Sequence, residues 1–132
     1  MKRKPLILIC IISVLFIIGS CSKDAGEGGN SSIIGKVYVK DYNFQFTALQ
    51  DEYYEGDIDV YIIYGDDASY GDRTRTNYDG TYEFKYLRPG MYHVYALSDD
   101  STTLGKIPII ENVEITKRKQ TIVAPEITIL KN

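Results

Sequence analysis

Four aspartates that lie close together in the sequence could supply the oxygen ligands of a calcium site. Asp66, Asp67 and Asp72 share one polar stretch, and Asp79 lies in the turn that follows. Ca²⁺ takes carboxylate and carbonyl oxygens, so the side chains are of a suitable type, although their spacing is not that of an EF-hand. Solvated acidic residues in turns give the same pattern. Calcium binding is therefore an alternative, and no resident metal or other cofactor is expected.

Catalytic chemistry finds little support in the sequence. His93 is the only histidine, and the chain has two cysteines, Cys10 and Cys21. No serine or cysteine has an evident general base for nucleophilic catalysis, and the ligands of a zinc site are lacking. The sequence therefore predicts no catalytic residues, and we expect that the protein is not an enzyme.

Tyrosine is the chemically distinctive residue of this chain, with twelve Tyr, four Phe and no Trp. Alternation along the expected strands places several aromatic and aliphatic side chains on the solvent face. Together these outward residues could form a patch that docks a protein or stacks on sugar rings. The alternative is that a tyrosine-rich sheet exposes tyrosine without binding anything. The candidate binding patch consists of Tyr38, Tyr61, Ile63, Tyr95 and Leu97.

The elements that must position these residues are expected to be β-strands. Apolar and polar residues alternate with a period of two in short segments separated by polar turns, which is typical of a β-sandwich. The predicted core includes Tyr82, Phe84 and Tyr92, and Leu87 breaks the alternation as a plug at the end of the core. The expected strands cover residues 33–40, 58–64, 73–76, 81–87, 91–97, 106–115 and 121–130.

Two turns punctuate the most regular part of the chain. Asp79 and Gly80 have the chemistry of a short β-hairpin, because aspartate bonds to nearby backbone N–H groups and glycine accepts a positive φ. Pro89 and Gly90 have the chemistry of a type II turn. The sequence thus predicts an all-β fold, an antiparallel immunoglobulin-like or transthyretin-like sandwich of about seven strands, with an N-terminal signal-peptide helix before it.

The run T-x-x-D-G-x-Y-x-F-x-x-L-x-P-G-x-Y-x-V over residues 76–94 resembles the signature of carboxypeptidase-regulatory-like domains and of the related B-type repeats of surface adhesins. Residues 35–39 resemble the opening G-x-V-x-V strand of that family, and residues 59–63 its second strand. The resemblance covers residues 33–130 and departs at Gly56, where a Gly-Ala pair is often found. It implies a transthyretin-like sandwich acting as an accessory module, and some adhesin repeats of this type bind calcium.

The N-terminus resembles a bacterial lipoprotein signal peptide over residues 1–20. Three basic residues precede an apolar run over residues 6–18, which is shorter than the ~20 residues of a membrane span. The motif Ile18-Gly-Ser-Cys21 resembles a lipobox, which implies cleavage before Cys21 and attachment of acyl chains such as palmitate there. Multiple acyl chains hold a soluble domain stably at a membrane. Cys10 would be removed with the signal peptide.

Residues 21–32 are polar and rich in Gly and Ser, which predicts a flexible linker before a domain of residues 33–132. Ser22, Asp24 and Glu27 resemble an export signal that sends lipoproteins to the cell surface, so a surface-exposed outer-membrane location is expected. Beyond residue 20 the chain has 12 basic and 18 acidic residues, a net charge of −6, and nucleic acid is not an expected partner.

These observations predict a membrane-anchored lipoprotein of the cell envelope whose β-sandwich is a non-catalytic binding or structural module. The expected partners are the membrane, through the lipid anchor, and an envelope protein or a glycan. Two alternatives remain at this point. One is a Ca²⁺-stabilised adhesin-like unit, and the other is a glycan-binding accessory of polysaccharide uptake.

Overall fold

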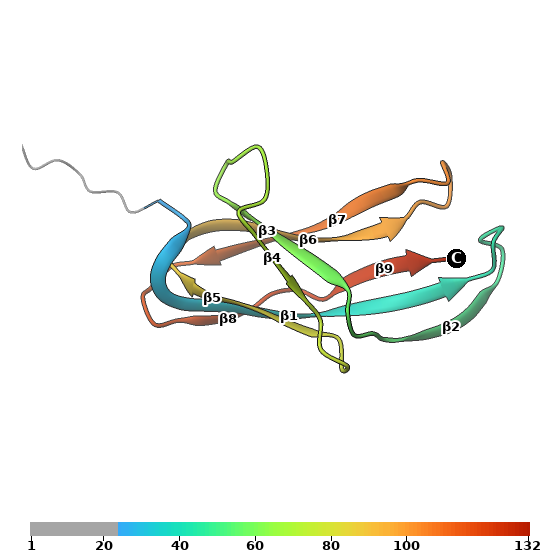
Figure 1. Ribbon diagram of the computed structural model, residues 1–132, viewed down its shortest axis with the longest axis horizontal. Coiled ribbons are helices and arrows are strands. Elements are labelled where there is room, and N and C mark those ends of the chain that lie inside the picture. Colours follow the sequence, from blue (N-terminus) through green and yellow to red (C-terminus); the bar gives the residue numbers. More distant parts are fainter. Residues whose placement is uncertain (1–23) are drawn as a thin grey trace, which may run out of the picture.

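The structure is a computed structural model that describes residues 24–132, and this part of the chain is an all-β sandwich of nine strands (Figure 1). The predicted signal peptide with its helix and the predicted lipidation site Cys21 lie outside the described residues. Among residues 24–132 there is no helix with the length and apolar character needed to cross a bilayer. The strands are β1 (Glu27–Tyr42), β2 (Leu49–Tyr54), β3 (Asp59–Tyr64), β4 (Asp72–Arg75), β5 (Thr81–Leu87), β6 (Gly90–Asp99), β7 (Lys106–Ile115), β8 (Thr121–Val123) and β9 (Ile127–Lys131).

Strand β1 is the central strand of the first sheet. Strands β5 and β8 pair with its first half, and β2 and β9 pair with its second half. Strands β8 and β9 run parallel to β1, whereas β2 and β5 are antiparallel to it. The second sheet has the order β4-β3-β6-β7 and is antiparallel throughout. The prediction of an all-β sandwich is confirmed, but the pairing is mixed and not wholly antiparallel.

The strand count exceeds the predicted seven for two physical reasons. Strand β2 is exposed at nearly every position, so it lacks the alternation that identifies a half-buried strand. The segment expected as one strand over residues 121–130 is divided at Pro125 into β8 and β9. Proline has no N–H to donate to a ladder, which accounts for this interruption. Pro108 lies in β7, an edge strand of its sheet, where a missing N–H costs no ladder bond on the outer side.

The core lies between the two sheets and is built from alternate side chains of their facing surfaces. The predicted core residues Tyr82, Phe84 and Tyr92 are all buried. Both sheets and the whole of this core belong to residues 24–132, so this segment contains the interactions that its own folding requires. The buried apolar residues are Ile33, Val37, Val39, Val60, Ile62, Tyr82, Phe84, Leu87, Tyr92, Val94, Ala96, Val113, Ile115, Ala124, Ile127 and Ile129.

A β-bulge explains why Leu87 breaks the alternation of β5. Phe84 aligns with Ile33 and Leu87 aligns with Ser31, so β5 has one more residue than β1 in this interval. Tyr86 adopts a positive φ of 59° and is 70% exposed, whereas Leu87 is only 1% exposed. The bulge turns Tyr86 outward and returns Leu87 to the core, which confirms the predicted plug.

The chain turns at both predicted positions, but the second turn is not of type II, and each turn connects the two sheets. Asp79 Oδ1 accepts a hydrogen bond from Thr81 N (3.1 Å), and Gly80 has a φ of 79°. Strand β4, before this turn, pairs with β3, whereas β5, after it, pairs with β1, so the predicted hairpin is wrong. The second turn likewise leads from β5 to β6. Gly90 there has a φ of 152°, far from the value of about 80° at this position of a type II turn.

The domain begins earlier than the predicted boundary at residue 33. Strand β1 starts at Glu27, and Ala25 packs against the core. Tyr92 Oη, on β6, accepts a hydrogen bond from Gly26 N (2.9 Å) and donates one to Arg88 O (2.6 Å). The predicted flexible linker over residues 21–32 is therefore wrong from Glu27 onward, because composition does not show these long-range contacts.

Leu87→Ala should lower the free energy of unfolding by about 2–5 kcal/mol, since it leaves a cavity at a buried site. The matched control is Tyr86→Ala at the neighbouring exposed position of the bulge, where we expect a change within about 0.5 kcal/mol. Urea denaturation of both variants checks this. Equal midpoints for the two variants would show that Leu87 does not close the core.

Tyr92→Phe should destabilise the domain by about 1–3 kcal/mol, because it leaves the Gly26 N–H and the Arg88 carbonyl without their partner. Tyr82→Phe is the control. The Tyr82 hydroxyl is buried and has no hydrogen-bond partner among the described residues, so its removal should be neutral or stabilising. Thermal melts compare the two, and amide exchange at Gly26 locates the effect. A Tyr92→Phe protein as stable as Tyr82→Phe would contradict the tethering role.

Candidate functional site

A cluster of tyrosines occupies the outer face of the β4-β3-β6-β7 sheet. Antiparallel pairing places Tyr61 of β3 opposite Tyr95 of β6, and their rings are stacked, with centroids 4.9 Å apart and an interplanar angle of 14°. Tyr70, from the loop between β3 and β4, meets Tyr61 in a T-shaped arrangement at 4.9 Å. Tyr70 is 50% exposed. Three aromatic rings from two strands and one loop thus form a continuous surface.

Aliphatic side chains extend this surface across the sheet. Ile110 of β7 lies opposite Tyr95 and is 49% exposed, and Leu97 of β6 is 39% exposed. Ile63 lies two residues beyond Tyr61 on the same face of β3. We call this surface the tyrosine face and define it by Tyr61, Ile63, Tyr70, Tyr95, Leu97 and Ile110.

Charged and polar groups border the tyrosine face. Asp59 Oδ1 lies 3.1 Å from Arg75 Nε and 3.9 Å from Arg73 Nε. These side chains are largely exposed, so their ion pairs contribute little to stability. A hollow of about 250 Å³ lies beside Tyr61 and Leu97, with Asp59, Lys106 and Lys131 on its rim. The border thus supplies hydrogen-bonding groups next to an apolar centre.

The Tyr95 side chain presents a protonated phenol at neutral pH. Burial raises the pKa of Tyr95 above its ordinary value, and the neighbouring Tyr61 and Tyr70 raise it further. Its hydroxyl therefore remains a hydrogen-bond donor across the physiological range. His93 lies beside Ile63 and forms a 2.5 Å hydrogen bond between its Nδ1 and Asn112 Oδ1.

Tyr38 does not belong to this surface, so the predicted five-residue patch is divided between the two sheets. Tyr38 lies on β1 and packs against Tyr54 of β2 in a T-shaped arrangement at 5.0 Å. Lys36 Nζ lies 4.6 Å from the centroid of the Tyr54 ring, and Tyr54 Oη donates a 2.7 Å hydrogen bond to Glu126. Sequence alternation assigns a residue to a face of its own strand but does not say which sheet that strand joins.

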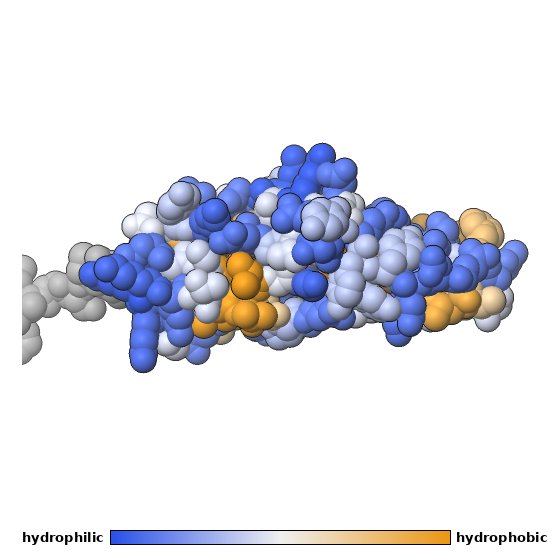
Figure 2. All heavy atoms as spheres, turned by 90° about the horizontal axis from the view of Figure 1, so that it is seen from below, coloured by the Kyte–Doolittle hydropathy of each residue, from blue (hydrophilic) through white to orange (hydrophobic). Residues whose placement is uncertain are grey.

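Figure 2 views the molecule from the side of the first sheet and shows a mostly hydrophilic surface, with one apolar area left of the centre and another toward the right end. A hollow of about 270 Å³ on this sheet is lined in part by Ile34, Val123 and Ala124. Val123 is 71% exposed.

Two residues of the tyrosine face, Tyr70 and Ile110, were absent from the predicted patch. Alternation along the expected strand over residues 106–115 would have placed Ile110 on the same face as Pro108. Nothing in the sequence marks the loop residue Tyr70 as part of the patch.

The four aspartates considered as calcium ligands are not brought together. Asp79 caps its own turn through the bond to Thr81, and this bond lowers its pKa. Asp72 Oδ1 accepts a hydrogen bond from Arg73 N (2.8 Å) at the start of β4. Within residues 24–132 no three His, Cys, Asp or Glu side chains form a group that could hold a metal ion. The geometry gives the calcium alternative no support.

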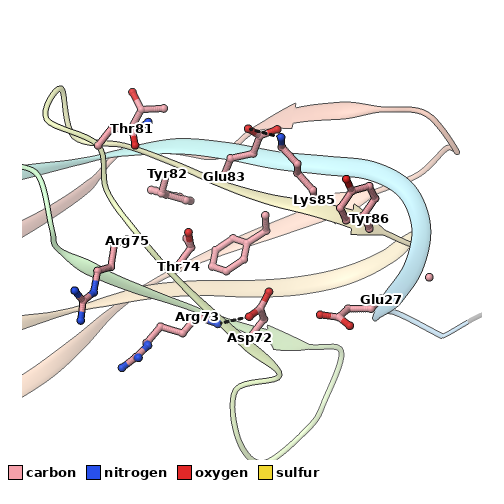
Figure 3. A pocket seen from close by; sticks show the side chains of 13 residues that line it. Glu27, Asp72, Arg73, Thr74, Arg75, Thr81, Tyr82, Glu83, Lys85 and Tyr86 are labelled. Carbon is pink, nitrogen blue, oxygen red and sulfur yellow. Dashed lines mark hydrogen bonds and ion pairs between the residues drawn. The ribbon is translucent and has the colours of Figure 1, made fainter.

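An open cleft of about 550 Å³ separates the edge strands β4 and β5 (Figure 3). Its lining includes Tyr82 and Thr74, and its charged groups lie at the margins. On the β5 side Glu83 is 3.9 Å from Lys85, and on the β4 side Arg73 and Arg75 point away from the opening.

Comparisons with known proteins give no family for the chain. No protein-family model and no curated protein matches it. Among solved structures, it is similar to that of a Pseudomonas aeruginosa protein whose description proposes carbohydrate binding. The two share 9% sequence identity, with a TM-score of 0.46, and the match covers 81% of this chain and 92% of the other.

Proposed function

We propose that this protein is a lipid-anchored, non-catalytic binding module of the bacterial cell envelope, and that its ligand docks on the tyrosine face. The observation that carries the proposal is the stacked pair of Tyr61 and Tyr95, extended by Tyr70, on a solvent-facing sheet surface. Aromatic rings with an apolar body and a polar hydroxyl are enriched where proteins make contact.

The geometry of the stack favours a protein ligand over a sugar. Tyr61 and Tyr95 each turn one ring face toward the other, and Tyr70 packs beside Tyr61. Flat ring faces, which a sugar ring would need, are thus partly occupied within the cluster. The exposed aliphatic side chains of Leu97 and Ile110 add apolar area, and the charged border around Asp59 resembles the polar rim of a protein interface.

The anchoring part of the proposal is supported by the N-terminal sequence. The lipobox-like motif ends at Cys21, three residues before the described domain begins at Asp24. Acylation of Cys21 would hold the domain at the outer membrane, and the partner would then be another component of the envelope. The export-like residues that follow Cys21 favour the cell surface.

Substituting Tyr61 and Tyr95 together by Ser should remove ligand binding while leaving the fold intact. Hot-spot residues at the centre of an interface contribute about 2 kcal/mol or more each, so we expect the double substitution to raise the dissociation constant of a captured envelope protein by roughly a thousandfold. The measurement is a titration of the purified partner after capture from an envelope fraction, accompanied by a glycan array.

The matched control is the pair Tyr38→Ser and Tyr54→Ser, which removes two packed tyrosines from the opposite sheet. Its binding should equal that of the unaltered protein. Binding to the array that disappears with Tyr61 and Tyr95 would identify a glycan as the ligand instead. Equal affinities for both double variants would show that the tyrosine face is not the binding surface.

Cys21→Ala should abolish anchoring and leave an uncleaved precursor without acyl chains. Intact mass and membrane fractionation check this, and protease treatment of whole cells tests surface exposure. Cys10→Ala is the control, since Cys10 lies within the apolar run that cleavage would remove. An unaltered chain that is found without acyl groups, or a Cys21→Ala protein that still carries them, would refute lipidation at this site.

A further inference from the structure

A basic hollow lies at the end of the sandwich where the described chain begins. It has a volume of about 400 Å³, and its lining comes from three segments that are distant in sequence. These are residues 28–30 of β1, the turn at Arg88 and Pro89, and Arg118 in the turn between β7 and β8. In Figure 1 both turns lie at the left end with the start of β1, whereas the C-terminus lies at the right end.

Glycines shape the wall of this hollow. Glu27 and Ser31 both align with Leu87, so residues 28–30 are looped out of the ladder. A Cβ at Gly29 would lie 2.0 Å from Leu87 O, so only glycine allows the loop to approach β5 so closely. At the next turn, a Cβ at Gly90 would lie 2.7 Å from the Cβ of Ala25. The backbone is thus closely packed around the two arginines.

Hydrogen bonds fix the basic turn Lys117-Arg118-Lys119 against the start of β1. Asn30 Oδ1 accepts a bond from Lys119 N (3.0 Å). The buried Ser31 donates its hydroxyl to Lys117 O (3.0 Å) and accepts a bond from Gln120 N (3.1 Å). These contacts cross 86 to 89 residues of sequence and hold the three cationic residues at this end of the domain.

The arginines of the hollow have no anionic partner in the described part of the chain. Neither Arg88 nor Arg118 forms an ion pair there, whereas Arg75, Lys106 and Lys131 each do. The Nε of Arg88 is buried and has no hydrogen-bond partner among these residues. A buried donor without a partner is costly, so the described residues leave the hydrogen-bonding capacity of the Arg88 guanidinium incompletely used.

The acid next to the looped-out segment forms no ion pair with either arginine in the described part of the chain. Glu27 is the residue next to the looped-out segment, and its carboxylate accepts a 3.4 Å hydrogen bond from the Tyr64 hydroxyl. Figure 3 shows Glu27 at the cleft between β4 and β5, near Asp72. The hollow therefore combines two unpaired guanidinium groups with the cations of Lys117 and Lys119 beside it. Guanidinium forks match the geometry of phosphate oxygens.

We propose that this hollow binds the phosphate of an anionic lipid headgroup and thereby orients the domain on the membrane. The inference rests on the proposed anchoring at Cys21, because the three residues from Cys21 to Asp24 span at most roughly 11 Å. The basic end is thus held next to the bilayer, where each cation near an anionic surface adds to binding. The long axis then points away from the membrane, and the tyrosine face remains open at the side.

The test uses residues 22–132, which lack Cys21 and therefore bind vesicles only through the domain itself. Binding to phosphatidylcholine vesicles with and without phosphatidylglycerol is measured by sedimentation. We expect binding that requires phosphatidylglycerol. Arg118→Gln, at an exposed turn position, should lower the partition coefficient about fivefold, which corresponds to about 1 kcal/mol per cation at an anionic surface. Adding Arg88→Gln should lower it by a further factor of about five.

Two further variants separate a built phosphate site from general charge attraction. Arg73→Gln with Arg75→Gln removes the same charge from β4 and should leave the partition coefficient unchanged. Arg88→Lys keeps the charge but loses the fork, and it should weaken binding. The proposal would be overturned if substituting Arg88 and Arg118 lowered the partition coefficient no more than substituting Arg73 and Arg75. Full vesicle binding by Arg88→Lys would also overturn it.

Inorganic phosphate at constant ionic strength distinguishes the source of the ligand. Competition by phosphate for vesicle binding supports a headgroup phosphate in the hollow. Stabilisation of the fold by phosphate without any vesicle binding would assign the hollow to a free anion and overturn the lipid proposal. The protein of residues 22–132 carries no acyl group, so its vesicle binding does not depend on whether Cys21 is lipidated. The mass measurement on the full chain decides separately whether Cys21 is lipidated.

Discussion

The pairing of β1 with four other strands is the constraint on which the rest of the structure depends. Its 16 residues are held by β5 and β8 along the first half and by β2 and β9 along the second. The last strands of the chain thus close against the first one, and the parallel partners β8 and β9 tie the C-terminal segment to the start of the domain. Glu27, Ser31 and Ser32 pair with β5 and β8 for this reason, although residues 27–32 have the composition of a linker. The same pairing joins the basic end of the domain to the end that carries the C-terminus.

Alternating burial made much of the fold predictable from the sequence. Because a half-buried strand exposes every second residue, the positions of β3, β5, β6 and β7 and the inward direction of Tyr82, Phe84 and Tyr92 followed from local pattern alone. Leu87 was predictable as a plug because its apolar side chain was out of phase with its neighbours, and the bulge at Tyr86 supplies the physical cause. Such features depend on a few adjacent residues.

Features that depend on the choice of partner strand were not predictable. Asp79 and Gly80 specify a tight turn, but the same local chemistry serves a hairpin or a crossing between sheets, and only the ladder to β1 decides between them. The predicted patch was divided for the same reason, since Tyr38 and Tyr61 have similar local patterns on strands of different sheets. Likewise, nothing near residues 28–30 indicates that Arg88 and Arg118 lie beside them.

Strand β6 connects the two surfaces to which we assign binding. Tyr92 points inward, and its hydroxyl holds Gly26 and Arg88 at the basic end, whereas Tyr95 points outward and stacks on Tyr61. An odd separation of three residues places the two side chains on opposite faces of one strand. Strand β6 cannot rotate about its own axis without breaking its ladders to β3 and β7. The tyrosine face therefore has a fixed orientation relative to the basic end. A membrane contact at the hollow would for that reason also set the direction in which the tyrosine face meets a partner.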